Sequence, residues 1–124
     1  MKDVLGVLKE ELVDNLNLRY CLGEYDKPKV QYPYIVGEYL EDANTNEDNR
    51  KSGQIILSVF TRGKRIELEN VADTLQEHFK FFCKEKNNSI VSIEYDNRLM
   101  VSTNDETIKK LEVYLKFSKW KGEN

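Results

Sequence analysis

The sequence predicts an α+β fold, in which one largely antiparallel sheet has two main helices packed on one of its faces. Apolar residues recur at helical spacing near the N-terminus and again in the middle of the chain, and β-branched and aromatic runs lie between and after them. The length of 124 residues, with 40% hydrophobic and 33% charged residues, fits one globular domain. We therefore expect a single domain over residues 1–124, with a short C-terminal tail at 121–124.

The first helix is predicted over Lys2–Leu16, because leucines recur there at one helical face. A short strand over Leu18–Leu22 follows, and then a loop over Gly23–Lys29. Pro33 restricts the preceding Tyr32 to an extended conformation, which begins the next strand.

A long hairpin is predicted next. Its strands are Tyr34–Leu40 and Gln54–Arg62, and the polar segment Glu41–Ser52 between them contains almost nothing to bury. We expect a mobile, charged loop at about 41–53. The second strand has one aliphatic face, which belongs under the helices, and one mixed face that includes Ile56 and Phe60.

A second helix is predicted over Lys64–Lys86, with Asn87-Asn88 as its stop. Phe81 lies off the apolar stripe of this helix, which makes it a candidate for a contact outside the subunit core. A second hairpin is predicted from Ser89–Tyr95 and Arg98–Thr103, with Asp96-Asn97 as its two-residue turn. The strict alternation from Leu111 to Ser118 predicts the last strand.

Composition excludes several classes of protein. The net charge of −3 and the pI of about 5.3 argue against nucleic-acid binding, which needs a basic footprint. The apolar runs are too short to span a membrane, and the N-terminus lacks the features of a secretory leader, so we expect a cytoplasmic protein. Cys21 and Cys83 are far apart and lack metal-ligand spacing, which indicates small buried hydrophobic residues in a reducing compartment.

No motif for catalysis, a cofactor or a metal emerges. The alternation of Asp42, Asn44 and Asn46 suggests a calcium loop, but the glycine and the bidentate glutamate that such a loop needs are replaced by Glu47 and Gly53. His78 is the only histidine and has no nucleophile motif near it, so a structural role is favoured. We expect no enzyme, no metal site and no cofactor.

Lysines gather near the C-terminus, at positions 109, 110, 116, 119 and 121. We interpret them as protection of an edge strand against aggregation, or as a surface for an acidic protein partner. A small basic and aromatic surface for nucleic acid is the less favoured alternative.

Several segments together resemble a known family. They are the strand Tyr-Pro-Tyr-Ile-Val-Gly-Glu-Tyr at 32–39, the acidic loop, the run Gly53–Gly63 and a helix that contains Ala72-Asp-Thr-Leu75. This order resembles the small tail-terminator proteins of long-tailed bacteriophages and prophages, which are also called tail-completion, minor capsid or head–tail joining proteins. The resemblance covers nearly the whole chain.

The resemblance implies a structural virion assembly protein with no active site. Such proteins form rings, here most simply a hexamer, which cap the tail tube and join it to the head connector. The implied partners are further copies of the chain, the tail-tube protein and the head-connector protein, with neither a membrane nor a specific nucleic acid. The implied location is the virion, and the host cytoplasm during assembly.

Two groups of residues are candidates for these contacts. The candidate docking loop comprises Glu41, Asp42, Asn44, Glu47, Asp48, Arg50 and Lys51. The candidate subunit interface comprises Ile56, Phe60, Arg62 and Phe81. Two alternatives remain open: a small cytosolic metal-dependent enzyme or nuclease that uses loop carboxylates, and a regulatory module that binds proteins by strand pairing.

Overall fold

The computed structural model describes residues 1–23, 31–43 and 50–121. The helical elements are α1 (Lys2–Lys9), which continues as the π-helical segment η1 (Glu10–Asn15), and α2 (Arg65–His78). The strands are β1 (Tyr20–Leu22), β2 (Tyr34–Glu41), β3 (Arg50–Thr61), β4 (Phe82–Lys86), β5 (Ser89–Val101) and β6 (Lys109–Lys121).

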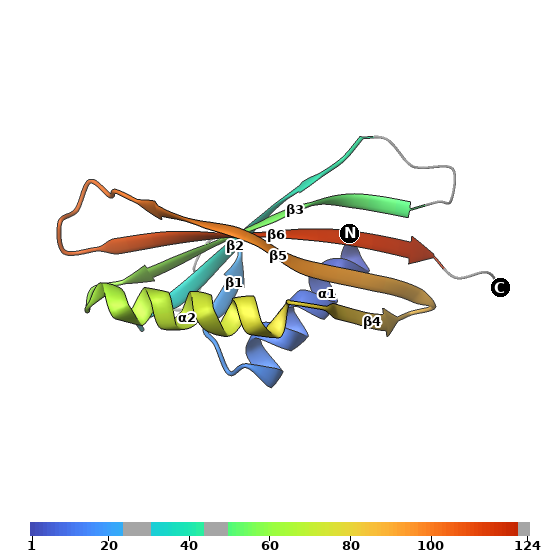
Figure 1. Cartoon of the computed structure of the whole chain (residues 1–124), viewed down its shortest axis with the longest axis horizontal. Coiled ribbons are helices and arrows are strands. Elements are labelled where there is room, and N and C mark those ends of the chain that lie inside the picture. The colour runs from blue at the N-terminus through green and yellow to red at the C-terminus, as the bar shows by residue number, and fades with distance from the viewer. Residues whose placement is uncertain (24–30, 44–49, 122–124) are drawn as a thin grey trace.

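The strands form one six-stranded sheet in the order β1-β2-β3-β6-β5-β4. Every neighbouring pair is antiparallel except β1 and β2, which run parallel. Both helices lie on the same side of this sheet, and the β2–β3 hairpin extends away from them at one end (Figure 1). The predicted α+β fold, with a largely antiparallel sheet and helices on one face, is therefore confirmed.

The core lies between the helices and one sheet face, which we call the helix side. The aliphatic face predicted for β3 is buried there, with Ile55, Leu57 and Val59 at most 1% exposed. α1 and α2 cover it with the side chains that their helical periodicity places on one stripe. The helical members of the core are Val4, Val7, Leu8, Leu12, Leu68, Val71, Ala72 and Leu75.

The prediction of one helix over Lys64–Lys86 is wrong in its second half. α2 ends at His78, and the chain then turns and returns as β4. Asn87 and Asn88 are the two-residue turn between β4 and β5, with φ of 50° and 63°. A pair of left-handed residues is the signature of a type I′ hairpin, whose twist matches that of the strands.

The predicted hairpin with a turn at Asp96-Asn97 is also wrong. β5 runs unbroken from Ser89 to Val101, and its register against β6 shifts between Tyr95 and Asn97. Asp96 is therefore the extra residue of a β-bulge. A bulge accepts residue types that also form turns, but it does not reverse the direction of the chain.

The central hairpin is longer than predicted. β2 includes Glu41, and β3 begins at Arg50, so part of the predicted loop 41–53 is paired strand. The backbone N–H of Asp42 donates to the carbonyl of Ser52, and the Ser52 hydroxyl donates to Asp42 Oδ2 at 2.8 Å. At the other end of the chain, Lys121 closes β6 rather than beginning a tail.

Candidate functional site

The sheet face opposite the helices has no helix over it among the described residues, and we call it the open face. The alternation of β3 places Ile56 and Phe60 there, and the pairing register places Tyr34 of β2 beside Phe60 and Tyr114 of β6 beside Ile56. These four side chains are half-buried by one another, so this face is a mixed apolar and polar surface.

A cluster of rings and cations lies at one end of the open face. The rings of Tyr34 and Phe60 stack with their centroids 5.0 Å apart, and Tyr32 lies 5.4 Å from Tyr34. The Lys110 ammonium lies 5.5 Å from the Phe60 ring, and the Arg62 guanidinium lies 5.7 Å from the Tyr32 ring. Both cations are within the range of a cation–π attraction. Half-exposed rings with cations beside them are typical of protein interaction surfaces.

The four residues predicted as the subunit interface do not form one patch. Ile56 and Phe60 lie in β3, near the middle of the sheet, and Arg62 directly follows that strand. Phe81 instead lies in the connection between α2 and β4, next to the sheet edge that β4 forms, where it is 91% exposed. It therefore lies outside the subunit core as predicted, but on a surface of its own.

Part of the predicted docking loop has a defined place. Glu41 ends β2, while Arg50 and Lys51 begin β3 opposite Trp120 and Lys119 of β6. The Arg50 guanidinium lies 6.0 Å from the Trp120 ring. Asn44, Glu47 and Asp48 lie outside the described residues.

The C-terminal lysines do not protect an edge, because β6 lies between β3 and β5 in the centre of the sheet. Most of them have specific contacts instead. Lys109 donates to the carbonyl of Gly63 at 2.6 Å, Lys116 lies 3.7 Å from Asp96, and Lys119 lies 3.3 Å from Asp3.

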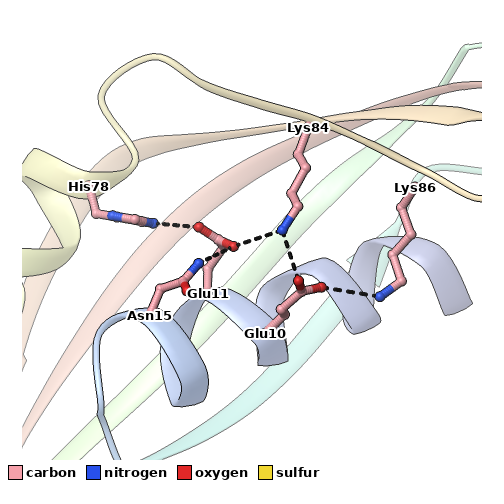
Figure 2. A network of polar contacts seen from close by, with 6 residues as sticks. All are labelled: Glu10, Glu11, Asn15, His78, Lys84 and Lys86. Carbon is pink, nitrogen blue, oxygen red and sulfur yellow. Dashed lines mark hydrogen bonds and ion pairs between the residues drawn. The ribbon is translucent and has the colours of Figure 1, made fainter.

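A polar network joins η1 to the end of α2 and to β4 (Figure 2). Glu11 projects from η1 with its side chain only 5% exposed, and its carboxylate lies 3.0 Å from His78 Nε2 and 3.3 Å from Lys84 Nζ. Asn15 donates to it at 2.7 Å. Glu10, on the same helix, accepts from Lys84 and Lys86 of β4.

These contacts determine the protonation of the network. Burial opposes the ionised form of Glu11, but hydrogen bonds from Asn15, His78 and Lys84 outweigh it and lower the pKa of Glu11 below its usual value. Hydrogen bonding to Glu10 similarly raises the pKa of Lys84. The carboxylate of Glu11 is thus held ionised and hydrogen-bonded, which suits a structural clamp.

The open cleft beside His78 is lined by Leu16, Asp73, Thr74, Glu77 and His78. Its one hydroxyl, that of Thr74, donates to the carbonyl of Asn70 at 2.9 Å instead of facing His78. Among the described residues, no group of three or more His, Cys, Asp and Glu side chains is arranged to hold a metal. Neither cysteine forms a disulfide bond; Cys21 is buried as predicted, and Cys83 is exposed, contrary to prediction.

Four large exposed apolar side chains lie at the two edges of the sheet. At one edge, Tyr39 and Leu40 of β2 are 45% and 64% exposed. At the other edge, Leu99 and Met100 of β5 are 53% and 45% exposed. The prediction from sequence missed all four, although a signal was present: consecutive apolar residues in a strand place an apolar side chain on both faces at once.

Comparisons with known proteins identify the fold alone. No protein-family model matches the chain, and no curated protein matches it. One solved structure, whose name states no function, aligns over 100% of this chain and 99% of its own, with a TM-score of 0.69 and 11% sequence identity. In the described part of the chain, neither helix has the length and apolar character needed to cross a membrane.

Proposed function

We propose that this protein is a structural subunit of a phage or prophage virion, of the tail-terminator type. Copies of the chain form a ring, most simply a hexamer, that caps the tail tube and joins it to the head connector. The protein acts by binding and shape, and it has no catalytic role.

Two lines of reasoning support the proposal. The order of elements and the run Tyr32–Tyr39 resemble that family, and the α+β fold agrees with this order from the first helix to β3. The polar clusters of the described residues connect elements of the fold, as Glu11 and Arg98 do, rather than converging on a cleft with a nucleophile.

The observation that supports the proposal most is the distribution of exposed apolar surface. A monomer that only needs to stay soluble keeps large apolar side chains scattered. Among the described residues, six of the eight large exposed apolar side chains lie at the two edges of one sheet: Leu22, Tyr39 and Leu40 at one edge, and Phe81, Leu99 and Met100 at the other. Ile66 of α2 and Ile90 of β5 are the exceptions. Two separate contact regions on one subunit are what a head-to-tail ring requires.

Deletion of the gene tests the function directly. In the phage or prophage that carries it, the deletion is expected to give tails of irregular length that fail to join heads, visible by electron microscopy of induced lysates. Complementation with the intact gene is expected to restore complete virions.

Two results would overturn the proposal. One is normal virion yield and tail length in the deletion strain. The other is a gene that lies outside any cluster of tail-tube and connector genes.

A further inference from the structure

The two edge strands, β1 and β4, each pair with only part of the neighbouring strand. β4 pairs only with Ser89–Ile93 of β5, and β1 pairs only with Ile35–Gly37 of β2. Among the described residues, no strand pairs with β5 from Glu94 to Val101, or with Glu38–Glu41 of β2, on the outward side. Unpaired strand edges of this kind are templates for another strand.

The uncovered part of β5 borders an open space. A cleft of about 500 Å³ lies between α2 and β5, lined by Asp73, Gln76, Glu77, Lys80, Phe81, Glu94 and Tyr95. Phe82, the first residue of β4, pairs with Ile93, so a strand added to β5 beyond Glu94 would continue the line of β4. One backbone group at this edge of β5 already has a hydrogen-bond partner, because the N–H of Tyr95 donates to the carbonyl of Phe79 at 3.0 Å.

The direction of the strands identifies the second copy as the occupant. Three successive antiparallel pairings lead from β2 through β3 and β6 to β5, so β2 and β5 run in opposite directions. In a ring whose axis follows the strands, all copies share one orientation. β2 of one copy then meets β5 of the next copy as an antiparallel neighbour, with both helix sides facing the same way.

The uncovered segments are also offset in a complementary way. β4 covers the N-terminal part of β5, and β1 covers the N-terminal part of β2. The free segments are therefore the C-terminal halves of two oppositely directed strands. A stagger of neighbouring copies along the strand direction, as strands have in a closed sheet, would bring these two halves opposite each other.

One register matches the side chains on both faces. Leu40 and Leu99 both belong to the open face, since they pair with Gln54 and Glu112 within the subunit. Placing Leu40 opposite Leu99 brings Tyr39 opposite Met100 on the helix side, where Arg65 of α2 contacts the Met100 sulfur. Glu41 then lies opposite Arg98 on the helix side, where the Arg98 guanidinium already pairs with Glu69 and Asp73 of α2.

We propose that the subunits join by edge pairing, in which Glu38–Glu41 of β2 in one copy adds as an antiparallel strand to Arg98–Val101 of β5 in the next copy, with Leu40 opposite Leu99. This inference rests on the proposed function, because it specifies how the ring closes. It assigns the interface to the two edges and leaves the open face free for other partners.

Directed cross-linking tests the pairing. In a Cys83→Ser background, which removes the exposed native thiol, the double variant Leu40→Cys/Leu99→Cys is treated at high protein concentration with a short bis-maleimide. The reagent must bridge about 5 Å, the separation of Cβ atoms that lie directly opposite each other across paired strands. We expect a ladder of covalent multimers that ends at the ring size.

Single variants establish the direction of the contact. Leu40→Cys alone and Leu99→Cys alone are expected to remain monomeric on denaturing gels, while a mixture of the two gives dimers and nothing larger. Tyr39→Cys/Met100→Cys provides a second pair in the same register. Leu40→Cys/Lys116→Cys is the matched control, because Lys116 is exposed on the central strand β6, and it is expected to give no ladder.

The outcomes separate this inference from the function. Absence of a ladder in both double variants, with folding verified by circular dichroism, would overturn the edge pairing. Dimers of Leu99→Cys alone would overturn it too, since they indicate a two-fold contact between β5 strands. Either result, combined with defective tails in the gene deletion strain, leaves the proposed function in place and excludes only this interface.

Discussion

At the scale of single residues, Glu11 is the best example of a polar group with a structural task. Its carboxylate is 4–5% exposed yet accepts hydrogen bonds from η1 itself, from the end of α2 and from β4. A buried charge is tolerated only when such partners compensate for lost hydration. The residue therefore connects η1 to α2 and β4, which lie far from η1 in the sequence.

Glu11→Gln is expected to lower the free energy of unfolding by about 1–3 kcal/mol, the cost of leaving buried polar partners without their charged acceptor. Urea unfolding at neutral pH measures it. Glu77→Gln is the control, because Glu77 is an exposed carboxylate on α2, and it should change stability little. Equal losses in both variants would show that Glu11 has no special role.

The pH dependence follows from the lowered pKa of Glu11. A carboxylate whose pKa is lower in the folded state than in the unfolded state stabilises the fold above its unfolded pKa, and this stabilisation disappears as the pH falls through the folded pKa. The difference in free energy of unfolding between wild type and Glu11→Gln should therefore be largest near neutral pH and should decrease as the pH is lowered into the acid range. A difference that stays constant or widens in acid would contradict the clamp.

Gly53 shows a second kind of residue-level constraint. A Cβ at this position would collide with the carbonyl oxygen of Leu40 and would lie 2.7 Å from the Phe117 ring. Backbone cannot yield as a side chain can, so Gly53→Ala should destabilise the fold by about 1–3 kcal/mol. Gly6→Ala is the contrasting variant, because only the flexible Lys86 side chain is near, and alanine should stabilise the helix by roughly 0.5–1 kcal/mol. Thermal unfolding of both variants tests the opposite signs.

At the scale of elements, periodicity predicted what lies in the core better than where elements end. The stripe from Leu68 to Leu75 is buried as predicted, as is the aliphatic face of β3. The helix was extended too far because Phe79 and Phe82 continue the helical spacing, although Phe82 belongs to a strand. A short apolar run fits both the helical and the strand periodicity, and here the pairing of Phe82–Lys86 with β5 favours the strand.

Turn chemistry was misassigned for a related reason. Asn87-Asn88 and Asp96-Asn97 contain similar residue types, but the first pair reverses the chain and the second forms a bulge. The sequence alone does not distinguish these cases, because the strand that pairs across each site is remote. β6, which supplies the pairing at the bulge, begins at Lys109.

The Asn87-Asn88 turn yields a prediction at this scale. Asn88 has φ of 63°, a left-handed conformation that glycine adopts freely and alanine resists by about 1–2 kcal/mol. Asn88→Ala should be less stable than Asn88→Gly by about that amount, and because both variants remove the side chain, the difference isolates the backbone. Chemical denaturation of the pair measures it, and equal stabilities would mean that the turn is not type I′.

At the scale of the whole molecule, the strand order determines where partners can bind. The order β1-β2-β3-β6-β5-β4 places the two shortest strands at the edges, and each covers only part of its neighbour. No local pattern contains this information, so the sequence predicted an interface from central residues such as Ile56 and did not identify Leu40 and Leu99 as exposed. Of the four residues predicted as the subunit interface, Phe81 was chosen because it lies off the apolar stripe of the predicted helix, and it is highly exposed in the structure.

The same architecture would let one small subunit bind neighbouring copies through its sheet edges and other proteins through its open face. The helix side is occupied by the core, while the edges and the open face remain available. Edge pairing would join the copies, and the ring and cation cluster around Phe60 would stay on the open face for the tail tube or the connector.

The mass and shape of the assembled protein test this account most directly. Purified protein, concentrated to its solubility limit, is examined by native mass spectrometry and by negative-stain electron microscopy. The account predicts closed rings with one discrete copy number, most simply six. Protein that remains monomeric at every concentration, and that forms no ring when purified tail tubes are added, would contradict it.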